Sequence, residues 1–229
     1  MNAINWPRIR DQLDANGWAV LQGLLSTDEC RAVAALFAGD KGFRSHVRMA
    51  RHGFGRGEYK YFSYPLPEFI GGLRASLYPP LAEIANDWNA AMGIETRYPP
   101  AHAHYLQQCH EAGQARPTPL LLSYGPGDYN RLHQDLYGDM VFPLQLTVLL
   151  SRPDTDFTGG EFVLTEQQAR MQSRPSVVPL AQGDAIIFAV RQRPVRGARG
   201  FTRVTMRHGV SEIRSGNRQA LGIIFHDAK

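Results

Sequence analysis

The sequence predicts an α+β protein in which helices from the N-terminal half support a β core of the jelly-roll kind. Helix-like spacing of apolar residues dominates the chain before Pro119. Short β-rich runs separated by Gly, Pro, Asp and Asn follow it, which is the pattern of a sandwich or barrel. A length of 229 residues suits one compact unit with a sizeable interior. We therefore expect a helical region over residues 1–118, packed on a β core over residues 119–229.

The N-terminal half contains several segments of predicted regular structure. The spacing of apolar residues predicts a helix over residues 6–16 and a short strand over residues 17–21. Ser26 to Glu29 carry an N-cap signal, so a second helix should begin there. Residues 68–92 predict a long helix with one buried face, and a further helix is expected over residues 102–113.

The C-terminal half is a succession of predicted strands with turn residues between them. The runs are LQLTVLL, GGEFVLT, SVVPLAQGDAIIFAV, FTRVTMRHGVSEI and RQALGIIFHD. Each is short and rich in β-branched or aromatic residues, which favours strands. Paired into sheets, these runs supply the β core.

Composition and charge indicate an ordinary globular protein with a basic excess. The net charge is +4, and because lysine occurs only at positions 41, 60 and 229, nearly all of the positive charge is arginine. Arginine suits bidentate contacts to phosphate or carboxylate, although codon bias from a GC-rich genome explains it equally well. No apolar run approaches the length of a membrane span, and the first residues lack the apolar region of a signal peptide. We expect a cytoplasmic protein with no membrane partner, in which Cys30 and Cys109 are incidental thiols.

A histidine and a carboxylate follow the first strand of the predicted core. In LLLSYGPGDYNRLHQD, residues 120–135, a buried run ends at a Gly-Pro-Gly turn and resumes with alternate residues that share one strand face. His133 and Asp135 are on that face. The alternation in FTRVTMRHGV places His208 among apolar neighbours, pointing into the core. A lone buried histidine most often bonds a backbone carbonyl, but His133, Asp135 and His208 together have the layout of a two-histidine, one-carboxylate metal triad.

The strand that follows His208 carries a possible anion pocket. Arg218 is followed on the same face by Ala220 and Gly222, so a cation would stand at the end of a space lined by very small residues. This arrangement suits the distal carboxylate of 2-oxoglutarate. The alternative is an exposed arginine at the start of a strand. Two other possible metal pairs, His102-x-His104 and His226-Asp227, fail on geometry and are predicted to be surface residues.

These residues together resemble the double-stranded β-helix core of the iron(II)/2-oxoglutarate dioxygenases. The matching pieces are Tyr124-x-Pro126-Gly127, His133-x-Asp135, Gly159-Gly160-Glu161-Phe162, Gly183 to Phe188, and His208-Gly209-Val210 followed by Arg218. The pattern is similar to that of prolyl-hydroxylase-type enzymes, and the segment from Tyr124 to Asp135 also resembles AlkB-type nucleic-acid demethylases. The spacing from His208 to Arg218 is the hydroxylase-like one.

The resemblance implies roles for these residues and a set of cofactors. His133, Asp135 and His208 would bind iron(II) as the catalytic centre. Arg218 and Tyr124 would hold 2-oxoglutarate, with Gln145 and Thr147 lining the pocket. Dioxygen would be the second cosubstrate, and the reaction would couple decarboxylation of 2-oxoglutarate to hydroxylation of a C–H bond.

Two basic segments suggest an anionic substrate. Residues 41–64 interleave cations with aromatics, which suits a single-stranded nucleic acid; a glycine-rich lid whose aromatics pack on the core is equally compatible. Residues 190–200 should form a loop near the barrel mouth. The candidate substrate residues are Arg48, Arg51, Arg56, Tyr59, Arg191 and Arg193. We expect oxidative dealkylation of damaged nucleic acid, in DNA repair; hydroxylation of a protein or peptide side chain is the alternative, and a binding module with a vestigial barrel is a third hypothesis.

Overall fold

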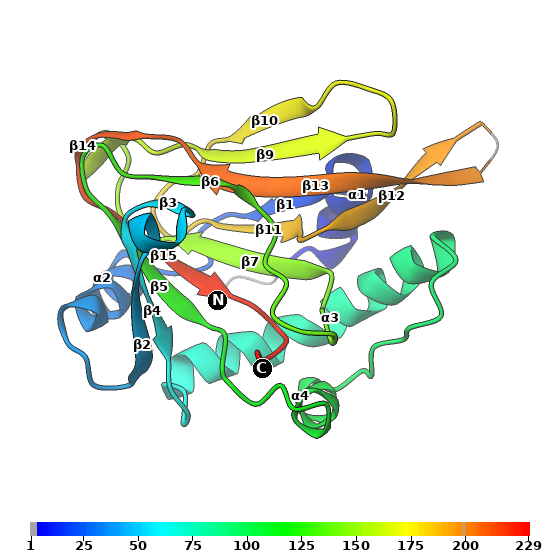
Figure 1. The fold of residues 1–229 in the computed structure, drawn as a ribbon, viewed down its shortest axis with the longest axis horizontal. Helices are drawn as coiled ribbons and strands as arrows, with labels where there is room; N and C mark the ends of the chain where they lie inside the picture. The colour runs from blue at the N-terminus through cyan, green and yellow to red at the C-terminus, as the bar shows by residue number, and fades with distance from the viewer. Residues whose placement is uncertain (1–3, 199) are drawn as a thin grey trace.

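A computed structural model describes residues 4–198 and 200–229 of the protein. Two antiparallel sheets lie face to face with helices outside them, as Figure 1 shows. The chain passes back and forth between the two sheets after residue 119, which is the jelly-roll arrangement that the sequence predicts. No helix in the described part of the chain is both long and apolar enough to cross a membrane.

The larger sheet has seven strands in the order β1-β11-β7-β15-β5-β4-β2. Their bounds are β1 Trp18–Leu21, β11 Ala185–Ala189, β7 Leu144–Leu149, β15 Arg218–Ile223, β5 Leu120–Tyr124, β4 Glu58–Phe62 and β2 Phe43–Arg48. The N-terminal half thus contributes three strands in addition to its helices. Residues alternate along each central strand between the two faces of the sheet. On β7, for example, Leu146 joins the main core cluster, whereas Gln145 and Thr147 point to the space between the sheets.

The smaller sheet has six strands: five follow the order β10-β9-β13-β6-β3, and the sixth, β12, pairs with β13. The bounds are β10 Arg174–Val178, β9 Phe162–Gln167, β13 Gly200–Val210, β6 Tyr129–His133, β3 Gly55–Arg56 and β12 Gln192–Gly197. A separate pair is formed by β8 Phe157–Gly159 and β14 Ile213–Gly216. The two strands that carry histidines, β6 and β13, are neighbours in this sheet.

The helices cover the outer face of the larger sheet. They are α1 Trp6–Asn16, α2 Thr27–Ala35, α3 Glu68–Ala91 and α4 His102–Glu111, with short 3-10 turns η1 Leu36–Ala38 and η2 Met49–His52. Ser26 and Glu29 form a capping box at the start of α2, as their spacing predicts. Helix α3 runs below the sheet in Figure 1. Its apolar face, including Leu73 and Leu77, is buried in the same cluster as Leu146 of β7, so the predicted helical support is present.

Candidate metal centre and cosubstrate pocket

Two histidines lie opposite each other on neighbouring strands of the smaller sheet. His133 ends β6 and His208 is its partner on β13 in the antiparallel ladder. Directly opposed side chains on one face are within contact distance, and the two ring centroids are 4.2 Å apart. Gly209 permits this close pairing, because a Cβ there would lie 2.6 Å from the carbonyl oxygen of Asn130.

Asp135 completes the cluster from the loop that follows β6. Its Oδ1 is 3.4 Å from His133 Nε2 and its Oδ2 is 3.4 Å from His208 Nε2. We expected Asp135 to continue the strand, but β6 ends at His133: the next inward residue of β13, Met206, donates its amide to the Arg191 carbonyl at 2.8 Å instead, at the start of the pairing with β12. The possible ligand atoms of the three residues all lie within 4.8 Å of one another. Two imidazole nitrogens and one carboxylate oxygen in this arrangement can hold a divalent first-row metal.

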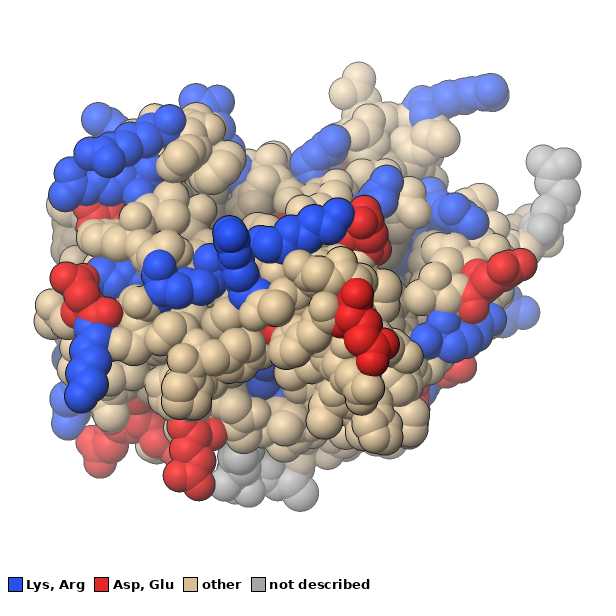
Figure 2. Space-filling model, turned by 60° about the horizontal axis from the view of Figure 1, so that its bottom comes forward, with Lys and Arg blue, Asp and Glu red and all other residues tan. Residues whose placement is uncertain are grey.

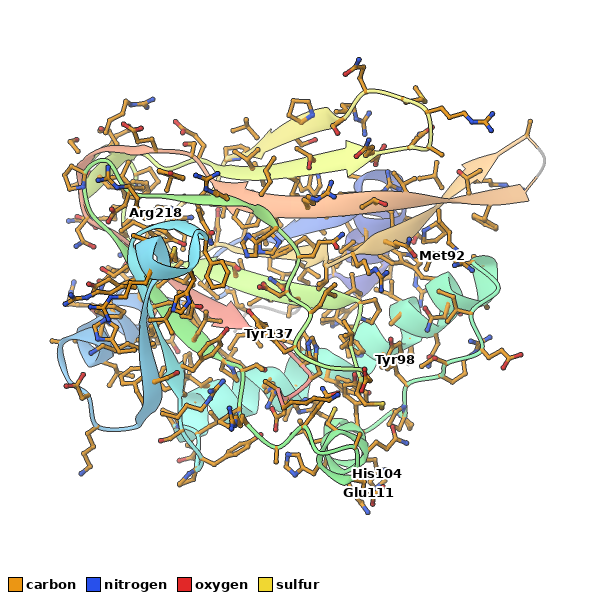
Figure 3. The ribbon with its side chains drawn as sticks, in the orientation of Figure 1. Met92, Tyr98, His104, Glu111, Tyr137 and Arg218 are labelled. Atoms are coloured by element: carbon orange, nitrogen blue, oxygen red, sulfur yellow. The ribbon has the colours of Figure 1, made fainter. Side chains whose placement is uncertain are left out.

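Two further side chains fix the Asp135 carboxylate. The Tyr137 hydroxyl donates a hydrogen bond to Oδ1 at 2.7 Å, and Gln145 Nε2 donates one to Oδ2 at 2.7 Å. Both are hydrogen bonds to an ionised group, which are among the stronger ones in proteins. Tyr137 lies on the segment between β6 and β7, across the site from Arg218 (Figure 3). Gln145 lies in the pocket as expected, whereas Tyr137 was not predicted; its position two residues after Asp135 was the only signal in the sequence.

Asp135 and the two histidines shift one another's pKa values. Burial opposes ionisation of Asp135, yet hydrogen bonds and charges from the two histidines hold its pKa well below the ordinary value. Burial also lowers the pKa of His133, but the Asp135 carboxylate and the Arg131 carbonyl more than offset this, so its pKa is raised. Burial and the neighbouring His133 lower the pKa of His208. A neutral His208 keeps a nitrogen lone pair available for a metal.

A cavity of about 350 Å³ beside the cluster contains a buried arginine. Arg218 begins β15, is 2% exposed, and has its guanidinium carbon 5.7 Å from the Tyr124 ring and 5.9 Å from the Phe157 ring. Its Nε has no hydrogen-bond partner among residues 4–198 and 200–229, and the nearby Glu161 pairs with Arg214 instead. Burying a cation without a partner is costly. The site therefore fits an anionic ligand, and the alternative of an exposed arginine is wrong.

Small residues and a neutral phenol complete the pocket. Ala220, Gly222 and Thr147 line the same cavity. Burial raises the pKa of Tyr124, although the charge of Arg218 partly offsets this, so the hydroxyl stays protonated. Gly160 closes the wall behind Arg218 with φ of +62°, and a Cβ there would lie 2.9 Å from Arg218 Cδ. The second glycine of the GGEF motif thus makes room for Arg218, whereas the first, Gly159, permits close approach of the Glu212 carbonyl oxygen.

The basic and aromatic segment 41–64 is mostly structural. Its strands β2 and β4 extend the larger sheet, and Phe43 stacks on the buried Phe62 with ring centroids 4.7 Å apart. Lys60 is 4% exposed and forms an ion pair with Asp40. Most of these aromatics therefore pack on the core, as the lid alternative supposed. Phe54 differs, because it is 49% exposed and lines the cavity.

The candidate substrate residues of segment 41–64 lie in different environments. Tyr59 lines the cavity. Arg51 and Arg56 are exposed on η2 and β3, next to the cavity-lining Gly53 and Phe54. Arg48 is exposed but is held by Glu58, with Nε 3.1 Å from the carboxylate. On the face drawn in Figure 2, Lys and Arg side chains form a band across the middle and a cluster at the upper left.

The prediction for residues 190–200 is wrong. Among the described residues of this range, Gln192–Gly197 form β12, which pairs with β13, and the hairpin extends away from β3 (Figure 1). Arg193 is 2% exposed, bonds Glu166, and donates to the Asp14 carbonyl at 3.0 Å, so it holds α1 and cannot meet a substrate. Arg191 remains exposed beside Gln134, whose amide bonds its carbonyl at 3.3 Å. Arg199 lies outside the described residues.

The histidines that we set aside are not all surface residues. His104 is exposed, but His102, His226 and Asp227 are buried. His102 Nε2 bonds the Phe225 carbonyl at 2.9 Å, and Asp227 pairs with the buried Arg74 at 2.7 Å. The surface prediction is therefore wrong for these three. His226 Nδ1 accepts a hydrogen bond from the Phe142 amide at 3.2 Å, and all three residues are outside the metal-ligand cluster of the described residues.

Comparison with known proteins assigns most of the chain to one sequence family. Residues 57–228 match Oxygenase-NA, described as an oxygenase catalysing oxidative methylation of damaged DNA. Two uncharacterized proteins of Mycobacterium tuberculosis, from strains CDC 1551 and H37Rv, are each 52% identical over 167 residues. The matched part is 73% of this chain and 72% of either relative.

Solved structures share the fold at low sequence identity. An oxidoreductase of the 2OG-Fe(II) oxygenase family from Burkholderia pseudomallei has a TM-score of 0.57 and 17% identity, covering 99% of this chain and 94% of that one. A prolyl-4-hydroxylase from Pseudomonas putida has a TM-score of 0.52 and 17% identity, covering 95% and 96%. The predicted jelly-roll fold and the resemblance to the iron(II)/2-oxoglutarate oxygenases are confirmed.

Proposed function

We propose a function from one premise: the chain belongs to the Oxygenase-NA family of oxygenases. In our proposal it is an iron(II)- and 2-oxoglutarate-dependent dioxygenase in which His133, Asp135 and His208 bind the metal. Arg218 receives the distal carboxylate of 2-oxoglutarate, with the Tyr124 hydroxyl beside it. The observation that carries the proposal is the buried Arg218, whose Nε has no partner among the described residues and which shares one cavity with the three metal ligands.

Iron(II) in this site supplies the redox chemistry by which dioxygen converts 2-oxoglutarate to succinate and carbon dioxide and hydroxylates a C–H bond. One oxygen atom of dioxygen enters succinate and the other enters the product. The chain's own part is positional. Tyr137 and Gln145 fix Asp135, and Arg218 orients the cosubstrate by its carboxylate. The buried walls of the cavity keep bulk water away from the reacting atoms.

The substrate that we propose is alkylated nucleic acid, with a role in DNA repair in the cytoplasm. Hydroxylation of an N-methyl group gives an N-hydroxymethyl product, which releases formaldehyde and leaves the repaired nitrogen. The family description supports this substrate class. Arg51, Arg56 and Arg191 support it as well, because they are exposed around the site and suit phosphates. Tyr59 reaches the cavity itself, whereas Arg48 pairs with Glu58 at the surface and Arg193 is buried in an ion pair with Glu166.

Hydroxylation of a protein side chain is the second candidate. Arg218 follows His208 by ten residues, the spacing that resembles prolyl-hydroxylase-type enzymes. This feature concerns the cosubstrate end of the cavity. The exposed arginines lie at the other end of the cavity, where the substrate would enter, and their charges favour a polyanionic substrate.

The test is conversion of 2-oxoglutarate to succinate by the iron-loaded protein, with a methylated single-stranded oligonucleotide, with proline-containing peptides, or with neither. We expect the oligonucleotide to stimulate turnover, with formaldehyde released in an amount equal to the succinate formed. His133→Ala should abolish the formation of both products. Stimulation by a peptide alone would replace the nucleic-acid substrate and keep the oxygenase. Failure of the iron-loaded protein to consume 2-oxoglutarate under any condition would refute the proposal.

A further inference from the structure

We infer that Phe54 is a platform on which a base of a single-stranded nucleic acid stacks at the mouth of the cavity, with Arg56 and Arg131 contacting the adjacent phosphates. This inference rests on the proposed nucleic-acid substrate. It adds that the nucleic acid is bound as a single strand, and it names the residues that contact the base and the phosphates. The argument depends on how Phe54 is held, on what surrounds its ring, and on the charges beside it.

Phe54 is exposed although its backbone is firmly held. Its carbonyl accepts a hydrogen bond at 2.9 Å from the amide of Arg131, two residues before the metal-ligand candidate His133. Gly55 lets the chain approach β6 closely, with φ of +137°, and a Cβ there would lie 2.3 Å from the Tyr129 carbonyl oxygen. Met49, at the start of η2, is 1% exposed and anchors the turn in the core. An apolar ring that is fixed in position and still half exposed has a surface available for a partner.

The surroundings of the Phe54 ring suit a planar partner. The His52 ring stacks against it, with centroids 5.3 Å apart and an interplanar angle of 21°. Leu132, on the neighbouring strand, is 46% exposed and lines the same cavity. Bases of a single strand stack on exposed aromatic rings with little dependence on sequence. In a duplex these base faces are already covered by their neighbours, so the platform selects a single strand.

The charges beside the platform are complementary to a phosphodiester backbone. Arg56 lies two residues after Phe54, and Arg131 lines the cavity next to it. Both are exposed, and within residues 4–198 and 200–229 neither forms an ion pair, whereas Arg48 nearby is held by Glu58. Unpaired arginines that flank an exposed ring match the alternation of phosphate and base along a strand. A peptide ligand would need this regular negative charge as well, and for that reason we favour nucleic acid.

The experiment measures binding of a fluorescent single-stranded oligonucleotide to the full-length protein by anisotropy, across a range of salt concentrations. Phe54→Leu should weaken binding by about 5- to 100-fold, the range typical of a lost base–aromatic stack. Phe54→Trp should restore binding close to the wild-type affinity. Arg56→Gln and Arg131→Gln should each reduce the slope of log affinity against log salt by about 0.7, whereas Phe54→Leu should leave the slope unchanged.

The matched control is Phe201→Leu, because Phe201 is 53% exposed and lies on β13 near the tip of the β12–β13 hairpin. It should bind like the wild type, and melting temperatures verify that every variant is folded. If Phe54→Leu binds the strand as well as Phe201→Leu does, the inference is refuted while the proposed function stands. An equal loss in Phe54→Leu and Phe54→Trp also refutes stacking. If the wild-type protein binds an acidic peptide but no oligonucleotide, the proposed substrate fails, and the platform assignment fails with it.

Discussion

Replacing Tyr137 by phenylalanine removes one hydroxyl from the candidate metal centre and leaves the ring in place. That hydroxyl donates a 2.7 Å hydrogen bond to Oδ1 of Asp135. Hydrogen bonds to a charged group contribute about 1.5–3 kcal/mol, and each 1.4 kcal/mol corresponds to about a tenfold change in affinity. If the bond holds the carboxylate in its ligating orientation, Tyr137→Phe should weaken metal binding by about 10- to 100-fold.

The assay is titration of the metal-free protein with cobalt(II), followed by its visible absorption, with iron(II) as a competitor. Tyr105→Phe is the matched control, because Tyr105 is also buried, its hydroxyl has no hydrogen-bond partner among the described residues, and it lies on α4, outside the lining of the cavity. Both variants should remain folded without metal, with a single cooperative melting transition. Equal cobalt(II) affinity in the wild type and Tyr137→Phe would show that the hydroxyl does not position Asp135.

Three further predictions concern the pocket wall, the buried ion pair and acid stability. Gly160→Ala should raise the KM for 2-oxoglutarate by about tenfold or more, because the added Cβ would lie 2.3 Å from Ile213 Cδ1 and 2.9 Å from Arg218 Cδ, so that both side chains must shift, in addition to strain of about 1–3 kcal/mol at this positive φ; cobalt(II) affinity should be unchanged. Arg193→Ala should lower the free energy of unfolding in urea by about 3–5 kcal/mol, since it leaves Glu166 without its buried partner, and should leave the KM for the oligonucleotide unaltered. Burial lowers the pKa of His102 to about 4, so the unfolded chain takes up the proton first as the pH falls. This group should therefore lower the free energy of unfolding by about 2 kcal/mol between neutral pH and about pH 5. In urea unfolding, His102→Gln should lose less stability than the wild type over this pH range. An identical loss in both proteins would contradict the assignment.

The clustering of His133, Asp135 and His208 could be predicted because the signals that bring these residues together are local. Alternation along a strand places His208 inward with Met206, and both are buried. The same alternation places Ala220 and Gly222 with Arg218, and all three line the cavity. Asp135 was placed on the wrong kind of element, but the two-residue spacing from His133 still brought its carboxylate to the cluster. The two-residue alternation of side chains along strands was therefore the signal that predicted which residues line the inner part of the site.

The features that the sequence did not predict depend on contacts between distant segments. Arg193 belongs to a basic, exposed-looking run, and only the packing of α1 against β12 gives it the Asp14 carbonyl as a partner. His226 and Asp227 are adjacent polar residues near the end of the chain, yet both are buried. Tyr137 lies in a loop without periodicity, so nothing local predicts that its hydroxyl meets Asp135. Charge and polarity alone do not reveal which polar groups find partners on folding.

The larger sheet extends beyond the part of the chain that matches the family. Its two outermost strands, β1 and β2, precede residue 57 and cover the edges of β11 and β4. A shortened chain starting at residue 57 would retain every proposed ligand of the metal and of 2-oxoglutarate. It would nevertheless expose two inner strands as new edges, and such unpaired edges act as templates for aggregation. We therefore expect a fragment without the first 56 residues to self-associate more readily than the full chain, and attempts to produce a minimal catalytic fragment should keep them.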